Sequence, residues 1–321
     1  MSFSRRQFSA GLSAVGVMMT LPRIARAACP FRVAVINDEI SQDFDHACHV
    51  AAHDFGLNWI ELRGMWKKNI TELTAGEIAE SQKILAKYSL RVTDIASPLY
   101  KVDWPGAPPS HQSERRDQFN ADFGFKQQDA LLEHCIELAK TFRTDRIRCF
   151  DFWRLDDVKP YREAINDKLR KAARRCAKDN LILLLENEMS CNTATGAEAA
   201  ATLKSIPEPN FMLNWDPGNA ATFPGSDPYP KGYDLLPKNR IGHCHAKNVI
   251  RQPGGKWEWA PVGTGVVDWA GQLRALDHDG YRHAVSLETH WRGAGTPEAS
   301  SRISMQGLKA ALAKAGTGCF S

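Results

Sequence analysis

Several common signatures are missing from this 321-residue chain. Its eight cysteines include no Cys-x-x-Cys pair, so their spacing matches neither a zinc ribbon nor a small disulfide scaffold. The first expected strand, FRVAVIN (31–37), is followed by NDEISQDF instead of a glycine-rich turn, which argues against a dinucleotide-binding fold. No low-complexity linker or domain break interrupts the sequence. These absences favour one large domain.

The body of the chain also lacks net charge. Residues 1–27 hold four of the 41 basic residues and none of the 37 acidic ones, so the remainder carries 37 of each sign. The formal net charge of +4 therefore comes from the first residues alone. A neutral body offers no electrostatic track for phosphates, so nucleic acid is not expected as a partner.

The first 27 residues have the order of a secretory signal peptide. A basic start precedes a short apolar stretch (10–21) and the small-residue segment Ala25-Arg26-Ala27. The stretch is too short to span a bilayer, so no stable membrane insertion is expected. The start, Ser-Arg-Arg-x-Phe, resembles the twin-arginine export signal, whose pathway exports folded proteins. We expect a signal peptide at 1–27, the export machinery as a transient partner, and a periplasmic domain at 28–321. The alternative is a disordered basic tail.

Apolar runs alternate with helical patterns along the body. Helical periodicity is clearest at 76–88, 127–142, 161–179 and 301–316. Eight strand–helix units predict a single (β/α)8 TIM barrel, with a doubly wound open sheet as the alternative. Long loops at 97–113 and 217–231 follow strands, which places them at the active face of a barrel. The expected strands are 31–37, 58–62, 91–96, 145–150, 181–187, 211–216, 241–247 and 283–289.

The last four expected strands each end in a side chain that can bind a metal. LLLENE, LNWDPGN, GHCHAKN and VSLETH supply Glu186, Asp216, His245 and Glu288. Because the C-terminal ends of barrel strands converge on one mouth, these side chains are expected near a common point. Three carboxylates and one imidazole suit one divalent ion, with Mn²⁺ as the first choice and Mg²⁺, Co²⁺ or Zn²⁺ as alternatives. A single carboxylate at a strand end is more often a solvated loop residue or a helix cap, so the prediction depends on the four together.

The same segments resemble the sugar phosphate isomerase/epimerase family, the xylose isomerase-like TIM barrels that also include AP endonuclease family 2. The resemblance covers most of residues 31–315. It implies one metal ion held by Glu186, Asp216, His245 and Glu288. It also implies that Glu186 and Glu288 are catalytic and move protons on opposite faces of a hydroxy-ketone. The segments that carry it are NDEISQDF, WIELR, IASPLYKVD, RIRCFDFWR, LLLENE, NWDPGN, HCHAKN, GTGVVDW and SLETHW.

Two positions depart from the family pattern. Asn248 stands where the family often has an acid after His-x-Lys, and Glu188 stands where many relatives carry histidine. We interpret Glu188 as a further acid/base group or as a ligand for a sugar hydroxyl. These changes leave the reaction open, because the same scaffold also hosts dehydratases and other lyases.

Further side chains near the strand ends are expected to bind substrate. Arg148 would contact a carboxylate or oxyanion, Trp153 would stack on a sugar face, and Lys247 would reach a substrate oxygen. For each of them, core packing or a structural ion pair is the competing interpretation. The expected substrate-binding set is Glu188, Lys247, Arg148, Trp153, Asn219 and His243.

Other expectations concern neighbouring positions. His243 would lie beneath His245 if the strand alternates regularly, and His290 would lie at the pocket rim with Asn219. Glu61 and Arg63 would pair with each other. Trp257 and Trp259 are expected to pack within a loop. Cys149 and Cys244 stand in apolar runs and are expected in the core, whereas Cys29 and Cys319 could pair in an oxidising compartment.

Together these features predict an exported, metal-dependent isomerase or epimerase. Phosphorylated sugars are mainly intracellular, so a free sugar, a keto-sugar or a sugar acid is the expected substrate. A lyase or dehydratase using the same metal site is the alternative, and a non-catalytic sugar-binding protein is a third possibility. A DNA-repair endonuclease is least expected for an exported, neutral body. The sequence does not name the sugar, and homo-oligomerisation stays open.

Overall fold

Eight parallel strands form the centre of the protein. The computed structural model describes residues 29–108, 119 and 121–320, so the expected signal peptide lies outside the described residues. The strands form one sheet in the order β1-β12-β9-β8-β7-β6-β5-β2. Their bounds are β1 (Arg32–Val35), β2 (Trp59–Leu62), β5 (Arg91–Ile95), β6 (Arg146–Cys149), β7 (Ile182–Glu186), β8 (Phe211–Trp215), β9 (Ile241–Ala246) and β12 (Ala284–Leu287).

The sheet curves into a nearly closed barrel. A parallel bridge between Ile36, directly after β1, and Glu61 in β2 joins the two ends of the strand order. Residues of the strands are buried almost throughout, as in β8, where all five are buried. Parallel strands covered on both faces require this pattern. All eight predicted strands are present, and the predicted (β/α)8 TIM barrel is confirmed.

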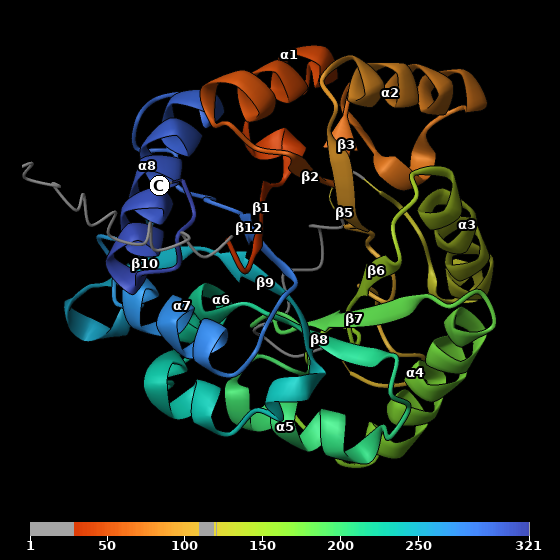
Figure 1. The fold of residues 1–321 in the computed structure, drawn as a ribbon. Helices are drawn as coiled ribbons and strands as arrows, with labels where there is room; N and C mark the ends of the chain where they lie inside the picture. The colour runs from red at the N-terminus through yellow and green to blue at the C-terminus, as the bar shows by residue number, and fades with distance from the viewer. Residues whose placement is uncertain (1–28, 109–118, 120, 321) are drawn as a thin grey trace, which may run out of the picture.

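Within the described residues, eight α-helices surround the strands. Figure 1 shows α8 beside α1, where the ring of helices closes. The four helices expected from periodicity are present as α2, α3, α4 and α8. Helix α8 begins earlier than expected, because Thr296 caps it and Pro297 occupies its first position. The bounds are α1 (Phe44–His49), α2 (Ala75–Lys87), α3 (Gln128–Thr141), α4 (Arg162–Ala177), α5 (Gly196–Ser205), α6 (Pro217–Thr222), α7 (Trp269–His278) and α8 (Pro297–Ala315).

The prediction of a loop at 217–231 is wrong for its first half, because helix α6 begins there. The Asp216 side chain caps this helix by accepting a hydrogen bond from the backbone N–H of Asn219 at 2.7 Å. The other loop, 97–113, runs into residues outside the described part. Two small hairpins complete the fold, β3 (Gly64–Met65) with β4 (Lys68–Asn69) and β10 (Asn248–Arg251) with β11 (Trp257–Ala260). Short 3-10 or π segments lie at Asn37–Glu39, Val50–Asp54, Ile70–Glu72, Phe125–Gln127, Pro228–Gly232, Lys238–Arg240 and Pro253–Gly255.

Two irregularities interrupt the barrel ladders. Leu213 and Asn214 are adjacent in β8, but their partners in β9, Ile241 and His243, are separated by one residue. A similar shift lies between β2 and β5, opposite Ile60 and Leu62. Bulges of this kind redirect side chains and are common next to functional sites. Both irregularities lie beside polar residues that point into the barrel.

The two ends of the described chain meet. Cys29 and Cys319, whose pairing the sequence left open, form a disulfide. Cys149 and Cys244 are fully buried, as expected for core residues. Among the described residues, no helix is both long and apolar enough to cross a bilayer.

Helix α8 packs so closely on the segment after β11 that Gly307 has no room for a side chain. A methyl group there would overlap the carbonyl group of Val262. We expect Gly307→Ala to lower the free energy of unfolding by about 1–3 kcal/mol through overpacking. Gly76→Ala is the matched control, since nothing lies within 4 Å of its methyl position in α2. Alanine should leave stability there unchanged or raise it by about 0.5–1 kcal/mol. Equal urea midpoints for the two variants would contradict this packing.

Candidate functional site

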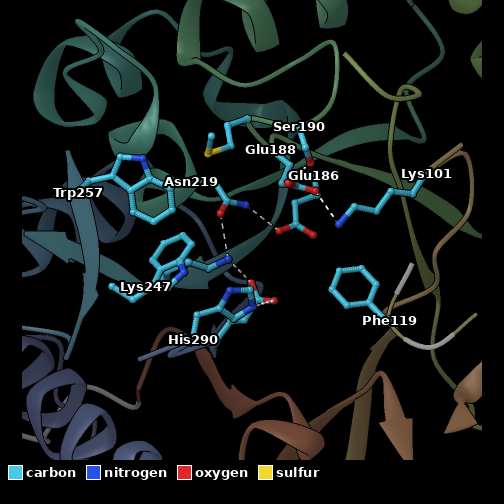
Figure 2. Close-up of a pocket in the computed structure, with 12 residues that line it drawn as sticks. Lys101, Phe119, Glu186, Glu188, Ser190, Asn219, Lys247, Trp257 and His290 are labelled. Atoms are coloured by element: carbon cyan, nitrogen blue, oxygen red, sulfur yellow. Dashed lines mark hydrogen bonds and ion pairs between the residues drawn. The ribbon is translucent and has the colours of Figure 1, made fainter. Parts of the chain in front are cut away.

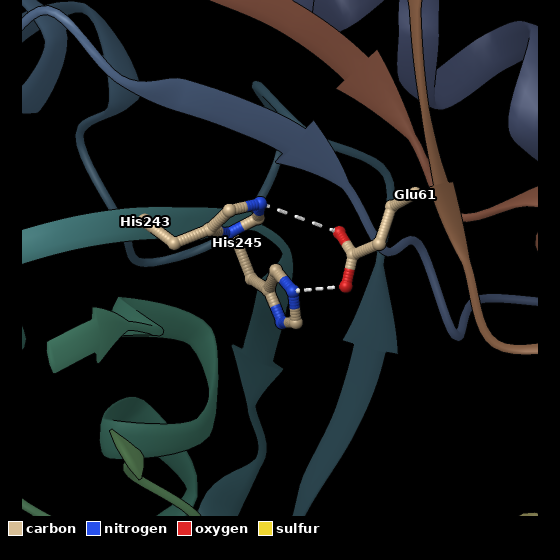
Figure 3. A group of neighbouring side chains, drawn as sticks. All are labelled: Glu61, His243 and His245. Carbon is tan, nitrogen blue, oxygen red and sulfur yellow. Dashed lines mark hydrogen bonds and ion pairs between the residues drawn. The ribbon is translucent and has the colours of Figure 1, made fainter. Parts of the chain in front are cut away.

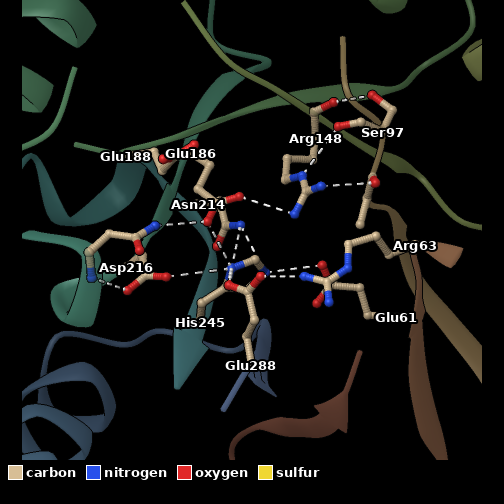
Figure 4. Close-up of polar contacts among 12 residues, drawn as sticks. Glu61, Arg63, Ser97, Arg148, Glu186, Glu188, Asn214, Asp216, His245 and Glu288 are labelled. Carbon is tan, nitrogen blue, oxygen red and sulfur yellow. Dashed lines mark hydrogen bonds and ion pairs between the residues drawn. The ribbon is translucent and has the colours of Figure 1, made fainter. Parts of the chain in front are cut away.

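Four side chains meet at the C-terminal mouth of the barrel. Glu186 ends β7, Asp216 follows β8, His245 lies near the end of β9, and Glu288 follows β12. The His245 Nδ1 atom lies 3.2 Å from Glu186 Oε1, 3.0 Å from Glu288 Oε2 and 3.8 Å from Asp216 Oδ2. One ligand atom from each residue lies within 4.8 Å of the others. Figure 4 shows these side chains pointing toward one another. The structure thus brings together the four residues that the sequence singled out.

The donor set fits a divalent ion. Ligands bound at about 2.0–2.2 Å to one ion are separated by distances like those measured around Nδ1. One buried oxygen of each acid, Glu186 Oε2, Asp216 Oδ2 and Glu288 Oε2, accepts no aligned hydrogen bond in the described part of the chain. Burial raises the pKa of Asp216 to about 6; Lys247 opposes this rise, and Glu288 and Glu186 add to it. A divalent cation would let all three carboxylates ionise together.

Each of the two glutamates expected to be catalytic forms an ion pair with an arginine. Arg148 Nη1 lies 3.1 Å from Glu186 Oε2, and Arg63 Nη1 lies 2.5 Å from Glu288 Oε1. Although burial raises the pKa of Glu186, the charges of His245 and Arg148 lower it to about 2. Arg148 is fully buried and lies outside the pocket lining, so its contact is with Glu186 and not with a ligand in the pocket.

The expected pair between Glu61 and Arg63 is wrong. Arg63 instead forms ion pairs with Asp38 at 2.9 Å, Glu39 at 2.8 Å and Glu288 at 2.5 Å. Strand β2 ends at Leu62, so the alternation that would align positions 61 and 63 does not continue. Glu61 turns into the barrel, where its Oε1 atom lies 3.0 Å from His245 Nε2.

A cavity of about 260 Å³ opens above the cluster. Glu186 and Glu288 line it, and Figure 2 shows Trp257 on the side opposite Lys101 and Phe119. The pocket therefore combines an aromatic wall, a polar wall and two carboxylates. Its lining residues are Lys101, Phe119, Glu186, Glu188, Met189, Ser190, Asn219, Lys247, Trp257, Trp259, Glu288 and His290.

Two of the expected substrate-binding residues connect the acids to one another. Lys247 Nζ lies 2.6 Å from Glu288 Oε2 and 2.9 Å from Asp216 Oδ2, and it donates a hydrogen bond to Asn219 Oδ1 at 3.0 Å. Asn219 Nδ2 donates to Glu186 Oε1 at 3.1 Å. Lys247 and Asn219 both line the pocket, so their polar groups hold the acids in place at the pocket floor.

Glu188 stands on the polar wall. Its Oε2 atom forms an ion pair with Lys101 Nζ at 2.7 Å, and the same ammonium lies 4.2 Å from the centre of the Phe119 ring. The departure from the family pattern at position 188 therefore comes with a cationic partner from the loop after β5. Lys101 lies in the loop 97–113, which was expected at the active face, but neither Lys101 nor Phe119 was singled out from the sequence.

Three further residues singled out from the sequence, Trp153, His243 and His290, lie in different places relative to the pocket. Trp153, expected to stack on a sugar, is 2% exposed and lies outside the pocket lining, where it packs with Phe150. His243 lies deeper in the barrel than His245, fully buried and outside the pocket lining, so its expected role in binding substrate is wrong. His290 lies at the pocket rim, with Nε2 3.0 Å from Glu288 Oε1.

The expectation of loop packing for Trp257 and Trp259 is wrong. They lie in β11 and line the pocket, with ring centres 4.9 Å apart. The sequence held a signal for this arrangement. Trp-Glu-Trp alternates with a period of two directly after Gly254-Gly255, which is typical of a hairpin strand.

Fold and site together define a class of protein. The family described as "Xylose isomerase-like TIM barrel" matches residues 50–311, and the chain belongs to this family. No curated protein matches the chain. Several solved structures share its fold.

The structural relatives have varied activities. The probable 3-DHS dehydratase AsbF from Bacillus anthracis is 20% identical with a TM-score of 0.64, over 87% of this chain and 99% of that one. D-psicose 3-epimerase, solved in the presence of D-fructose, is 15% identical with a TM-score of 0.63, over 89% and 100%. The IolI protein, solved with a zinc atom, is 14% identical with a TM-score of 0.65, over 91% and 100%. At these identities the likeness shows the shared fold, and each activity is that of the relative.

The ion pairs of Arg63 predict a large stability effect. Arg63→Met would leave Asp38, Glu39 and Glu288 without their shared cation in a buried setting, where loss of one partner costs about 3–5 kcal/mol. Arg302→Met is the control, because Arg302 is 39% exposed and its pairs with Asp54 and Glu298 lie at the surface. We expect that control to lose less than about 1 kcal/mol. Similar losses in guanidinium unfolding would contradict a structural role for the buried network.

Proposed function

We propose that the protein is an exported, divalent-metal-dependent isomerase or epimerase that acts on a non-phosphorylated sugar or keto-sugar. One observation carries the proposal: Glu186 and Glu288 belong to the four-residue cluster and also line the pocket. Two carboxylates beside a Lewis acid are what proton transfer next to a carbonyl requires. Export follows from the leader at 1–27, and the periplasm is the proposed location.

The proposed chemistry assigns a role to each residue at the pocket floor. An ion held by Glu186, Asp216, His245 and Glu288 would act as the Lewis acid for the substrate oxygens. One glutamate would accept the proton from the carbon next to the carbonyl, and the other would return a proton to the opposite face. Lys247 and Asn219 keep the two acids oriented through the contacts described above.

Proton exchange with solvent needs a path to the buried acids. The side chain of His290 is 27% exposed, and its Nε2 atom lies 3.0 Å from Glu288 Oε1. We assign it the role of connecting Glu288 to water at the pocket rim. Of the two glutamates, Glu288 is the one with this contact among the described residues.

The pocket walls support a carbohydrate substrate. Sugars present C–H groups on a ring face and hydroxyl groups at the edge. Trp257 and Trp259 offer an apolar surface for the first, and Glu188 with Lys101 offers polar partners for the second. Hydrogen bonds to charged groups are the stronger ones, so this wall would select hydroxyl positions.

A lyase or dehydratase acting on a keto-sugar or sugar acid is the second candidate. The observation that favours it is Glu188, a third carboxylate on the pocket surface in addition to Glu186 and Glu288. A third acid would provide a group for the departing hydroxyl. Elimination would yield a product with one water fewer, which mass spectrometry separates from an epimer.

Metal content tests the cluster directly. We expect elemental analysis to find about one divalent ion per chain, since the site offers four converging donors. Asp216→Asn should lower that content strongly. Glu188→Gln, which alters the pocket wall outside the cluster, should keep it. Protein that lacks a divalent ion after gentle purification and metal add-back would refute the metal site.

Solvent exchange tests the reaction. Incubation with free sugars and keto-sugars in D₂O should place deuterium on the carbon next to a carbonyl of the true substrate. Glu288→Gln should slow this exchange by about 100-fold or more, because a general base is lost. The variant's circular dichroism should match that of the wild type. Binding without exchange for every sugar tried would favour a sugar-binding protein instead.

A further inference from the structure

The ring of His245 faces two different environments. Its Nδ1 atom faces the three acids of the cluster. On the other side, its Nε2 atom lies 3.0 Å from Glu61 Oε1, and Figure 3 shows this contact. A neutral imidazole has one protonated and one unprotonated nitrogen, and only the unprotonated one binds a metal. The proton must therefore lie on Nε2 if Nδ1 is to serve as a ligand.

A second group competes for the same nitrogen. Asn214 Nδ2 lies 3.1 Å from His245 Nε2 and 3.4 Å from Nδ1. Both distances are within hydrogen-bonding range, and the amide can donate to either nitrogen. Glu61 can only accept when ionised, and a charge-assisted hydrogen bond is about twice as strong as a neutral one. Glu186 and Glu288 lie about equally close to Nδ1, but as ligands of an ion they would not accept a proton from it. Glu61 is then the carboxylate left to accept the ring proton, on Nε2.

The layer below keeps Glu61 available for this bond. His243 Nε2 lies 3.2 Å from Asp94 Oδ1 but 3.7 Å from Glu61 Oε2. His243 therefore pairs with Asp94, and the nearer partner of Glu61 is His245. All of these side chains are fully buried. Asp94 and His243 stand next to the two irregularities in the barrel ladders.

We infer that Glu61 is a positioning residue for the metal site: it accepts the Nε2 proton of His245 and so presents Nδ1 to the ion. Glu61 does not line the pocket and is not one of the four donors; it belongs to a separate group of possible ligands with His243 and His245. Among the four donors, its contact is with His245. Carboxylates in this outer position typically contribute 10- to 100-fold to metal affinity. The inference rests on the proposed function, since it needs the ion that the four donors would hold.

Calorimetric titration of chelator-treated full-length protein with Mn²⁺ tests the inference. Glu61→Gln should bind Mn²⁺ about 10- to 100-fold more weakly than the wild type. A glutamine amide can donate to Nε2 and so favour the wrong tautomer. Asp94→Asn is the matched control, because Asp94 is equally buried but pairs with His243. It should bind Mn²⁺ like the wild type.

Each outcome has a separate meaning. A wild type that does not bind Mn²⁺ would overturn the proposed metal function itself. Equal affinity of the wild type and Glu61→Gln would overturn the role of Glu61 and leave the metal function standing. An equal loss of Mn²⁺ affinity in Glu61→Gln and Asp94→Asn would also overturn the role of Glu61. The loss would then come from a general disturbance of the barrel interior.

A measurement on the wild type avoids dependence on how the variants fold. Nitrogen-15 NMR of the Zn²⁺-loaded protein should show the His245 ring proton on Nε2 and the metal on Nδ1. The opposite assignment of the two nitrogens would overturn the inference, whatever the affinity of the variants.

Discussion

The mutual repulsion of three buried carboxylates is the constraint on which the rest of this site depends. Glu186, Asp216 and Glu288 are all buried and surround one imidazole at the floor of the pocket. Burying like charges so close together is unfavourable unless opposite charges accompany them. The barrel provides these charges from its strand ends: Arg148 beside Glu186, Arg63 beside Glu288, and Lys247 between Glu288 and Asp216.

The protein's own cations leave a regular pattern of oxygens. Glu186 has one oxygen beside Arg148 and the other facing His245. Glu288 has one oxygen beside Arg63 and the other facing His245. Asp216 uses one oxygen to cap α6 and directs the other at the cluster. Each acid thus turns one oxygen toward the imidazole. Lys247 contacts that oxygen of Glu288 and of Asp216, and Asn219 donates to that of Glu186.

The fold and the four donors were predictable because both depend on local patterns. Apolar runs marked the strands, and the barrel geometry brought their C-terminal ends together. Arg63 was misassigned because β2 ends one residue earlier than the pairing required. Trp153 was misassigned because nothing in a single tryptophan distinguishes a buried ring from an exposed one. Lys101 and Phe119 were missed because their pocket contacts are with Glu188 and with each other, far along the chain, and no local pattern marks such contacts.

The disulfide between Cys29 and Cys319 has a topological consequence. Their Cα atoms are 4.4 Å apart, so the described chain is covalently joined start to end. Strand β1 also pairs with β12, the last strand, along its full length. The nearly closed barrel is therefore a ring of strand–helix units in which the first and last units are neighbours. The pocket depends on the cyclic order of those units, so a circularly permuted chain that opens elsewhere would preserve the same mouth and the same four donors.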